Sequence, residues 1–152
     1  PSRLDRALVE TELAAGIDGG MIATIDPYLY TVTATVRDRR TPQEVEQAIT
    51  AELDHIASGE ISFEEFEKAR KQARALFAYD SESVSSQGFW QGFAETLVGN
   101  HTWFDNYLDR MMSVTLDDVK RVAADVFQKN RRTVGWYIPT GDGSSTEDDL
   151  DG

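Results

Sequence analysis

The sequence of residues 28–37 is YLYTVTATVR. Successive side chains of a strand point to opposite faces, so this stretch divides into two sets. The apolar set is Tyr30, Val32, Ala34 and Val36, and the polar set is Thr31, Thr33, Thr35 and Arg37. This alternation and the many β-branched residues predict a half-buried strand with one face on a core.

Residues 14–25 predict a second strand just before this one. Gly16, Gly19 and Gly20 interrupt it, which is typical of a strand that bends or bulges early. Asp26–Pro27 then supplies the turn between the two strands. Further upstream, apolar residues between Leu4 and about Leu13 fall at helical spacing and predict a short amphipathic helix.

The strands are followed by two helices that begin with capping boxes. Thr41 precedes Pro42, a residue favoured at the first helical position, and Glu44 can reach back to the cap. Ser62 and Glu65 repeat this pattern and begin a helix that runs to about residue 80. Serines at 81–86 predict a kink or break, after which a helical segment continues to residue 99.

Two more helices and a strand complete the predicted fold. Thr102 is expected to cap the first of these helices and Thr115 the second. Thr133–Ile138 predicts a closing strand, which Pro139 ends. The order α-β-β-α-α-α-α-β is typical of an α+β fold, in which helices cover one face of an antiparallel sheet.

Residues 1–139 form one predicted domain, and residues 140–152 predict an acidic, disordered tail. The chain of 152 residues is long enough to bury a core. Because it opens inside the predicted first helix, we expect it to have been cut from a longer polypeptide.

Composition excludes several classes of function. The formal net charge of −12 argues against a nucleic-acid partner, since phosphate binding needs a basic face. No apolar run approaches the length of a membrane span, so we expect a soluble protein without a membrane partner. The absence of cysteine fits a reducing compartment but leaves both a cytoplasmic and a periplasmic location open.

Histidine is the first candidate for chemistry, and the chain has two. His55 could bind zinc with Glu52 or Asp54, but no second histidine lies one turn away, which favours an exposed helix residue. His101 could be a ligand or a base, yet its place between two helices favours a turn residue. Neither His-x-x-Glu-His nor His-Glu-x-x-His occurs, so the sequence predicts no catalytic zinc site and no catalytic residue.

Three other patterns have stronger structural than functional interpretations. The serines at 81–86 lie in no Gly-x-Ser-x-Gly motif, and the glycines at 16–20 lack the ending of a phosphate-binding loop. A set of aromatic residues at helical spacing could line a peptide groove, but core packing is the more common role of such residues. They are Phe89, Trp90, Phe93, Trp103, Phe104 and Tyr107.

Five stretches, in order along the chain, carry a family resemblance. They are SRLDRALVE at 2–10, DPYLY at 26–30, EEFEKAR at 64–70, SVTLDDV at 113–119 and TVGWYIP at 133–139. Together they resemble the pitrilysin/insulinase family of zinc metallopeptidases, which includes mitochondrial processing peptidase.

The resemblance implies a two-part domain whose first half holds zinc through His-x-x-Glu-His and a downstream glutamate. The chain aligns after those positions, so zinc is expected in the missing N-terminal half and no metal here. The family also holds substrate with an Arg and a Tyr in its non-catalytic homologous domain. Val9 and Gly16 stand at those places, so that role is not carried over. This mismatch and the closing strand favour the later half of a catalytic domain over its inactive partner.

We therefore expect a fragment of a bacterial-type zinc metalloendopeptidase that is inactive alone and serves as a scaffold and as a wall of the substrate chamber. The implied partners are the missing catalytic half or a homologous domain, and peptide substrate in the full protein. Exposed core surface also predicts self-association. The alternative is a non-catalytic structural or interaction subunit of the same family.

Overall fold

The two predicted strands pair as an antiparallel hairpin, β1 (Ala14–Met21) and β2 (Tyr30–Val36). The computed structural model describes residues 1–22, 24–26 and 28–139. Ala14 pairs with Val36 and Gly16 with Thr35, so Ala15 is an extra residue and forms a bulge. The predicted early bulge is therefore confirmed.

The first strand is shorter than predicted, because it ends at Met21 instead of residue 25. Met21 pairs with Tyr30, the first residue of β2, and the described residues between them pair with no strand. The predicted turn at Asp26–Pro27 falls partly outside the described residues.

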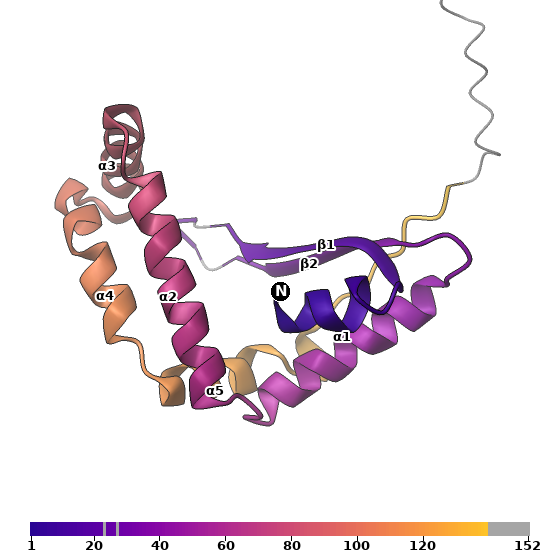
Figure 1. Ribbon diagram of the computed structural model, residues 1–152. Helices are drawn as coiled ribbons and strands as arrows, with labels where there is room; N and C mark the ends of the chain where they lie inside the picture. Colours follow the sequence, from indigo (N-terminus) through magenta and orange to yellow (C-terminus); the bar gives the residue numbers. More distant parts are fainter. Residues whose placement is uncertain (23, 27, 140–152) are drawn as a thin grey trace, which may run out of the picture.

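One face of the hairpin is covered by helices, as predicted. A short π-helix, η1 (Asp5–Val9), and the long helix α1 (Pro42–Ala57) lie on the same side of the strands (Figure 1). Leu8 of η1, Ala14 of β1 and Val45 of α1 are buried together, and Ile17 and Val36 pack around them. The three threonines of β2 point away from the helices and are exposed. The period-two pattern of residues 30–36 therefore separates a core face from an open face.

The helix starts follow their local sequence closely. Thr41 and Glu44 form the predicted capping box of α1, and Thr115 and Asp118 form another at α5 (Leu116–Val126). The break after α2 (Phe63–Asp80) is also confirmed, since Ser83 caps a separate helix, α3 (Val84–Val98).

Two predicted features at the helix starts are wrong. Asn100, not Thr102, caps the short 3-10 helix η2 (His101–Asn106), which leads into α4 (Tyr107–Ser113). The Asn100 side chain accepts the Thr102 N–H at 3.0 Å, so Thr102 is the capped residue. At α2, Ser62 accepts the Glu65 N–H, but the Glu65 carboxylate does not return to it and binds Arg3 instead.

The closing strand at Thr133–Ile138 is not formed. After a short 3-10 turn, η3 (Lys129–Arg131), the described residues to 139 pair with no strand, and the sheet has only β1 and β2. Both outer edges of the sheet are open, but this segment pairs with neither in the described residues, and Tyr137 is 93% exposed. The observed order is therefore helix, two strands and a run of helices.

The remaining helices form a second group on one side of the molecule (Figure 1). In this group α3 packs on η2, and α4 packs on both η2 and α2. The last long helix, α5, packs instead on α1, in the first group with the hairpin and η1. The two groups meet at the corner where α1 passes into α2.

Candidate interaction surface

His55 does not assemble a metal site with its neighbours. It is exposed on α1 and borders a shallow depression with Arg3, Arg6 and Glu52. Glu52 lies 3.8 Å from the Arg3 guanidinium, and Asp54 lies 3.8 Å from the Lys129 ammonium. Both candidate carboxylates are thus paired with cations, and two guanidinium groups beside the imidazole disfavour a bound metal ion. The exposed-helix interpretation of His55 holds.

His101 contacts Glu95 of α3 through both its backbone and its side chain. Its backbone N–H donates to Glu95 Oε2 at 2.8 Å, and its Nδ1 lies 3.4 Å from the same oxygen. The side chain is exposed, so the contact is a solvated one. His101 is the first residue of η2, so it lies in a short 3-10 helix and not in a turn.

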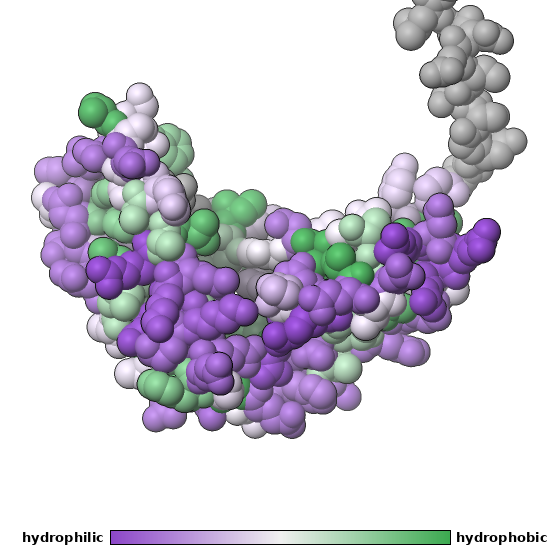
Figure 2. All heavy atoms as spheres, in the orientation of Figure 1, coloured by the Kyte–Doolittle hydropathy of each residue, from purple (hydrophilic) through white to green (hydrophobic). Residues whose placement is uncertain are grey.

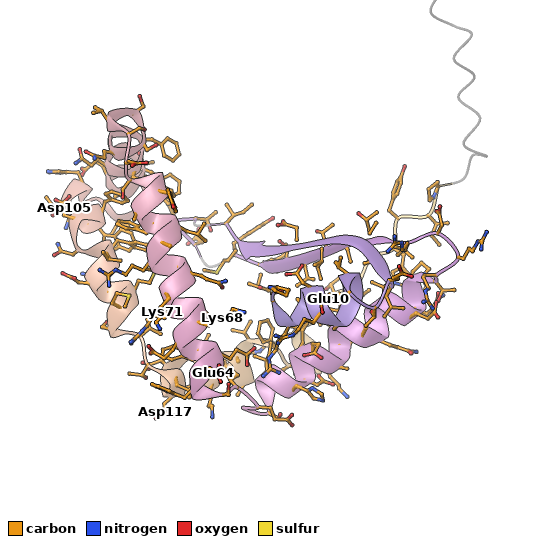
Figure 3. The ribbon with its side chains drawn as sticks, in the orientation of Figure 1. Glu10, Glu64, Lys68, Lys71, Asp105 and Asp117 are labelled. Carbon is orange, nitrogen blue, oxygen red and sulfur yellow. The ribbon has the colours of Figure 1, made fainter. Side chains whose placement is uncertain are left out.

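Neither a metal cluster nor a serine nucleophile is assembled in the described ranges. No three His, Cys, Asp or Glu side chains of those residues converge on one point. Figure 3 shows this for Glu10, Asp105 and Asp117, which lie in different parts of the molecule. The serines after α2 are used locally: Ser81 donates to the Phe77 carbonyl, and Ser83 binds Ser86. A resident zinc ion therefore does not fit this part of the chain.

The aromatic residues pack on one another across the second helix group. The Phe77 ring lies 5.1 Å from Phe104 and 5.4 Å from Tyr107, and Trp90 stacks on Phe104 at 5.9 Å between centroids. Each such pair contributes about 0.5–1.5 kcal/mol beyond its buried area. These contacts hold α2, α3, η2 and α4 together, which supports the packing interpretation. Phe89 is the least covered of them, at 62% exposed.

A groove at the corner between the two groups was not predicted. Its volume is about 370 Å³, and its walls come from α1, α2, α4 and α5. The apolar residues lining it are Ile56, Ile61, Phe66, Ala69, Ala73, Met111, Val114 and Val119, with Arg3, Glu65 and Arg70 at the polar positions. Sequence spacing places Ile61 near Phe66 and Val114 near Val119 as hydrophobic staples, but it does not bring these two pairs into one groove.

The most unusual property of the molecule is how much apolar surface it exposes. At the end of the hairpin, five large apolar side chains are each between 58% and 71% exposed: Met21, Ile22, Ile25, Tyr28 and Leu29. Leu76, Tyr79 and Val84 are similarly open where α2 passes into α3. Figure 2 shows apolar side chains along the hollow between the hairpin and the second helix group.

Only six apolar residues of the described chain are buried: Leu8, Ala14, Val45, Phe66, Ala94 and Ala123. Monomeric soluble proteins rarely expose contiguous apolar patches of this kind unless a partner covers them. No helix of the described ranges is long and apolar enough to cross a membrane. The candidate functional feature is accordingly an interface, formed by the hairpin end, the sheet edges and the α2–α3 surface.

Comparison with known proteins gives this interface its context. Residues 1–73 match the family model of the peptidase M16 inactive domain. A crystal structure of a candidate zinc protease from Bordetella pertussis Tohama I is 32% identical, with a TM-score of 0.78, and the match covers 91% of this chain and 76% of that one. The inactive peptidase domain of a candidate zinc protease from Bordetella parapertussis is also 32% identical, with a TM-score of 0.81, covering 91% and 75%. No curated protein matched the chain.

These matches correct one expectation. The residues at Val9 and Gly16 favour the later half of a catalytic domain, whereas the family model and the Bordetella parapertussis structure are both of inactive domains. The substitution of the two substrate-holding residues is therefore no indication of a catalytic domain. Identity above 30% over nine-tenths of the chain shows the family as well as the fold. The chain belongs to the M16 peptidase family, as an inactive peptidase domain of the zinc-protease type.

Proposed function

We propose that this chain is the non-catalytic partner of a zinc-binding peptidase half, which it completes as a scaffold and as a wall of the peptide chamber. The observation that supports this most is the uncovered apolar surface at the hairpin end. Burial of apolar area is worth about 25 cal/mol per Å², so a partner that covers five large side chains gains substantial free energy. In this proposal zinc is held by the partner half and peptide substrate is bound in the assembled protein.

The sheet supports the same proposal. In the described residues β1 and β2 have no further strand on either outer edge, and their unpaired N–H and C=O groups can accept another strand. The segment Thr133–Pro139 is apolar, exposed and without a strand partner, so it can also join a larger sheet. A partner that supplies strands would cover both the outer edges of the sheet and this segment.

The proposal can be tested by mixing the full chain with the zinc-binding half of its parent, expressed separately. Complex formation is measured by light scattering, and peptide cleavage by a quenched fluorescent peptide. The expected result is a one-to-one complex and cleavage that neither half supports alone. Ile22→Glu and Leu29→Glu should weaken the complex at least tenfold, because each buries a charge in the apolar interface.

A matched control separates interface loss from misfolding. Gln47→Glu adds a charge at an exposed position of α1, away from the hairpin end, and should leave the complex intact. Without a partner, the chain should self-associate, and adding the zinc-binding half should reverse this. Failure of the halves to associate at high micromolar concentration would count against the proposal.

The second candidate is a structural subunit in an assembly that cleaves nothing. The matches to inactive domains support it equally. The parent's other domain decides between the two: an intact His-x-x-Glu-His supports the peptidase, and its loss supports the structural subunit.

A further inference from the structure

The side chain of Arg3 joins three elements at the corner between the two helix groups. Its Nε donates to Glu65 Oε1 at 2.5 Å, and one terminal nitrogen donates to Glu65 Oε2 at 2.7 Å. The same nitrogen also donates to the Glu60 carbonyl in the loop between α1 and α2, and the other lies 3.8 Å from Glu52 of α1. This is the two-pronged geometry in which a planar guanidinium binds a carboxylate most strongly.

Glu65 is directed to Arg3 against its local sequence pattern. It occupies the position that closes a capping box, and the equivalent residues Glu44 and Asp118 both return to their caps, Thr41 and Thr115. At α2 the Ser62 hydroxyl accepts the Glu65 N–H at 3.1 Å, but the carboxylate leaves the box for a residue 62 positions away. The chain therefore gives up a local contact in favour of a long-range one.

Arg3 and its two carboxylate partners, Glu65 and Glu52, are better shielded from solvent than the long-range ion pair Arg37–Glu12. The side chains of the Arg3–Glu65 pair are 21% and 32% exposed, whereas Arg37 and Glu12 are 48% and 71% exposed and lie 3.7 Å apart. Reduced solvent screening makes an ion pair of this kind worth more than a surface pair. The hydrogen bond from Arg3 lowers the pKa of Glu65, which is consistent with a carboxylate held in its charged form.

Little else connects the two groups. In the described part of the chain, α2, α3, η2 and α4 share no extended interface with the hairpin, η1, α1 or α5. What remains is the corner groove, which Arg3 and Glu65 help to line, and two short connections: the loop after α1, and Val114–Thr115 between α4 and α5. The loop after α1 contains Gly59 with φ of +83°, a conformation in which residues with side chains are strained.

From this arrangement we propose that Arg3 is a latch that fixes the angle between the α2–α4 helix group and the sheet, with the two connections at residues 58–62 and 114–115 as the hinge. While Arg3 binds Glu65, the angle between the two groups is fixed, and so is the width of the hollow between them. When this contact breaks, the α2–α4 helix group turns about the hinge as one unit, because its own aromatic contacts hold it together. The latch does not depend on which partner covers the hollow.

The test is a distance measurement across the corner in the full chain. Because the sequence has no cysteine, Gln47→Cys on α1 and Gln72→Cys on α2 introduce two unique spin-label sites, both exposed. Pulsed electron spin resonance should give a narrow distance distribution in the parent. Arg3→Ala should at least double its width, and Arg3→Lys should broaden it less, because lysine keeps the charge but loses the fork.

Two controls make the result specific. Arg37→Ala removes an ion pair far from the corner and should leave the distribution narrow. A second label pair within the helix group, Gln72→Cys with Asp109→Cys, should stay narrow in Arg3→Ala if the group moves as a unit. Should Arg3→Ala fail to fold, Glu65→Gln decides, since it removes the carboxylate and leaves the Glu60 contact in place. The latch would be overturned if the distance distribution across the corner kept its width without the Arg3–Glu65 contact. It would also be overturned if the distribution within the helix group broadened as well.

Discussion

The ring of Tyr30 meets the ring of Phe127 edge to face, with 5.5 Å between their centroids and 74° between their planes. Tyr30 is the first residue of β2, and Phe127 follows the last residue of α5. Because α5 also packs on α1, this contact closes the first group between its sheet and its last helix. The sequence predicts both elements but not the contact between them.

Replacing Phe127 with leucine should destabilise the chain by about 0.5–1.5 kcal/mol, since the apolar volume is largely kept and the edge-to-face term is lost. Urea unfolding followed by circular dichroism measures this as a lower midpoint with an unchanged slope. Tyr137→Leu is the control: this side chain is 93% exposed and should change stability by less than about 0.5 kcal/mol. Equal effects of the two substitutions would show that the ring contact contributes nothing.

The cap of η2 provides a second prediction, because the sequence predicts Thr102 as the capping residue and the structure has Asn100. Asn100→Ala removes the acceptor of the Thr102 N–H and hydroxyl, at 3.0 and 2.7 Å, and should cost about 0.5–2 kcal/mol. Thr102→Ala removes only a donor to Asn100 and should cost clearly less. Thr115→Ala, at a cap on which sequence and structure agree, gives the reference value. Thermal melts of the three variants rank them, and a larger loss for Thr102→Ala would restore the sequence prediction.

Local patterns predicted the helix starts because both partners of a cap lie within three residues of each other. Thr41 with Glu44 and Thr115 with Asp118 are of this kind. Glu65 shows the limit of such patterns. Its spacing from Ser62 is the same, but a guanidinium 62 residues away outcompetes the local N–H. Sequence spacing contains no information about that competitor.

The closing strand shows a different limit. Thr133–Ile138 has the composition of a strand, but strand propensity mainly describes how well side chains fit a pleated surface that a neighbour provides. In the described part of the chain this segment lies against no strand, although both outer edges of the sheet are open. The candidate site shows the same limit. The sequence around His55 and His101 is enough to predict that neither binds a metal ion. The corner groove, by contrast, combines residues from four helices, so only the folded structure reveals it.

Zinc titration gives a third prediction. By isothermal calorimetry the full chain should show no one-to-one zinc binding in the nanomolar range, because the carboxylates nearest His55 are paired with Arg3 and Lys129. Any weaker, non-stoichiometric zinc binding should be the same after both histidines are replaced with alanine. A stoichiometric site that those replacements abolish would contradict the absence of ligand geometry around them.

The dependence of stability on pH gives the last prediction. Hydrogen bonding to Arg3 lowers the pKa of Glu65 below its ordinary value of 4.5. A carboxyl group whose pKa is lower in the folded state binds fewer protons there than in the unfolded state. It therefore adds stability above pH 4.5, and this stability is lost as the pH falls through the lower, folded-state pKa.

Glu65→Gln cannot titrate, so the variant should be less stable than the parent at pH 7, and the difference should shrink as the pH falls below 4.5. Urea unfolding at a series of pH values measures both curves. Glu44→Gln is the matched control, because the pKa of Glu44 is also lowered but by its own cap, Thr41, in a local contact. If Arg3 is the cause, adding Arg3→Ala should abolish most of the pH-dependent difference at position 65 and leave that at position 44 intact. A difference at position 65 that persists without Arg3 would assign the lowered pKa to the helix start instead of the long-range pair.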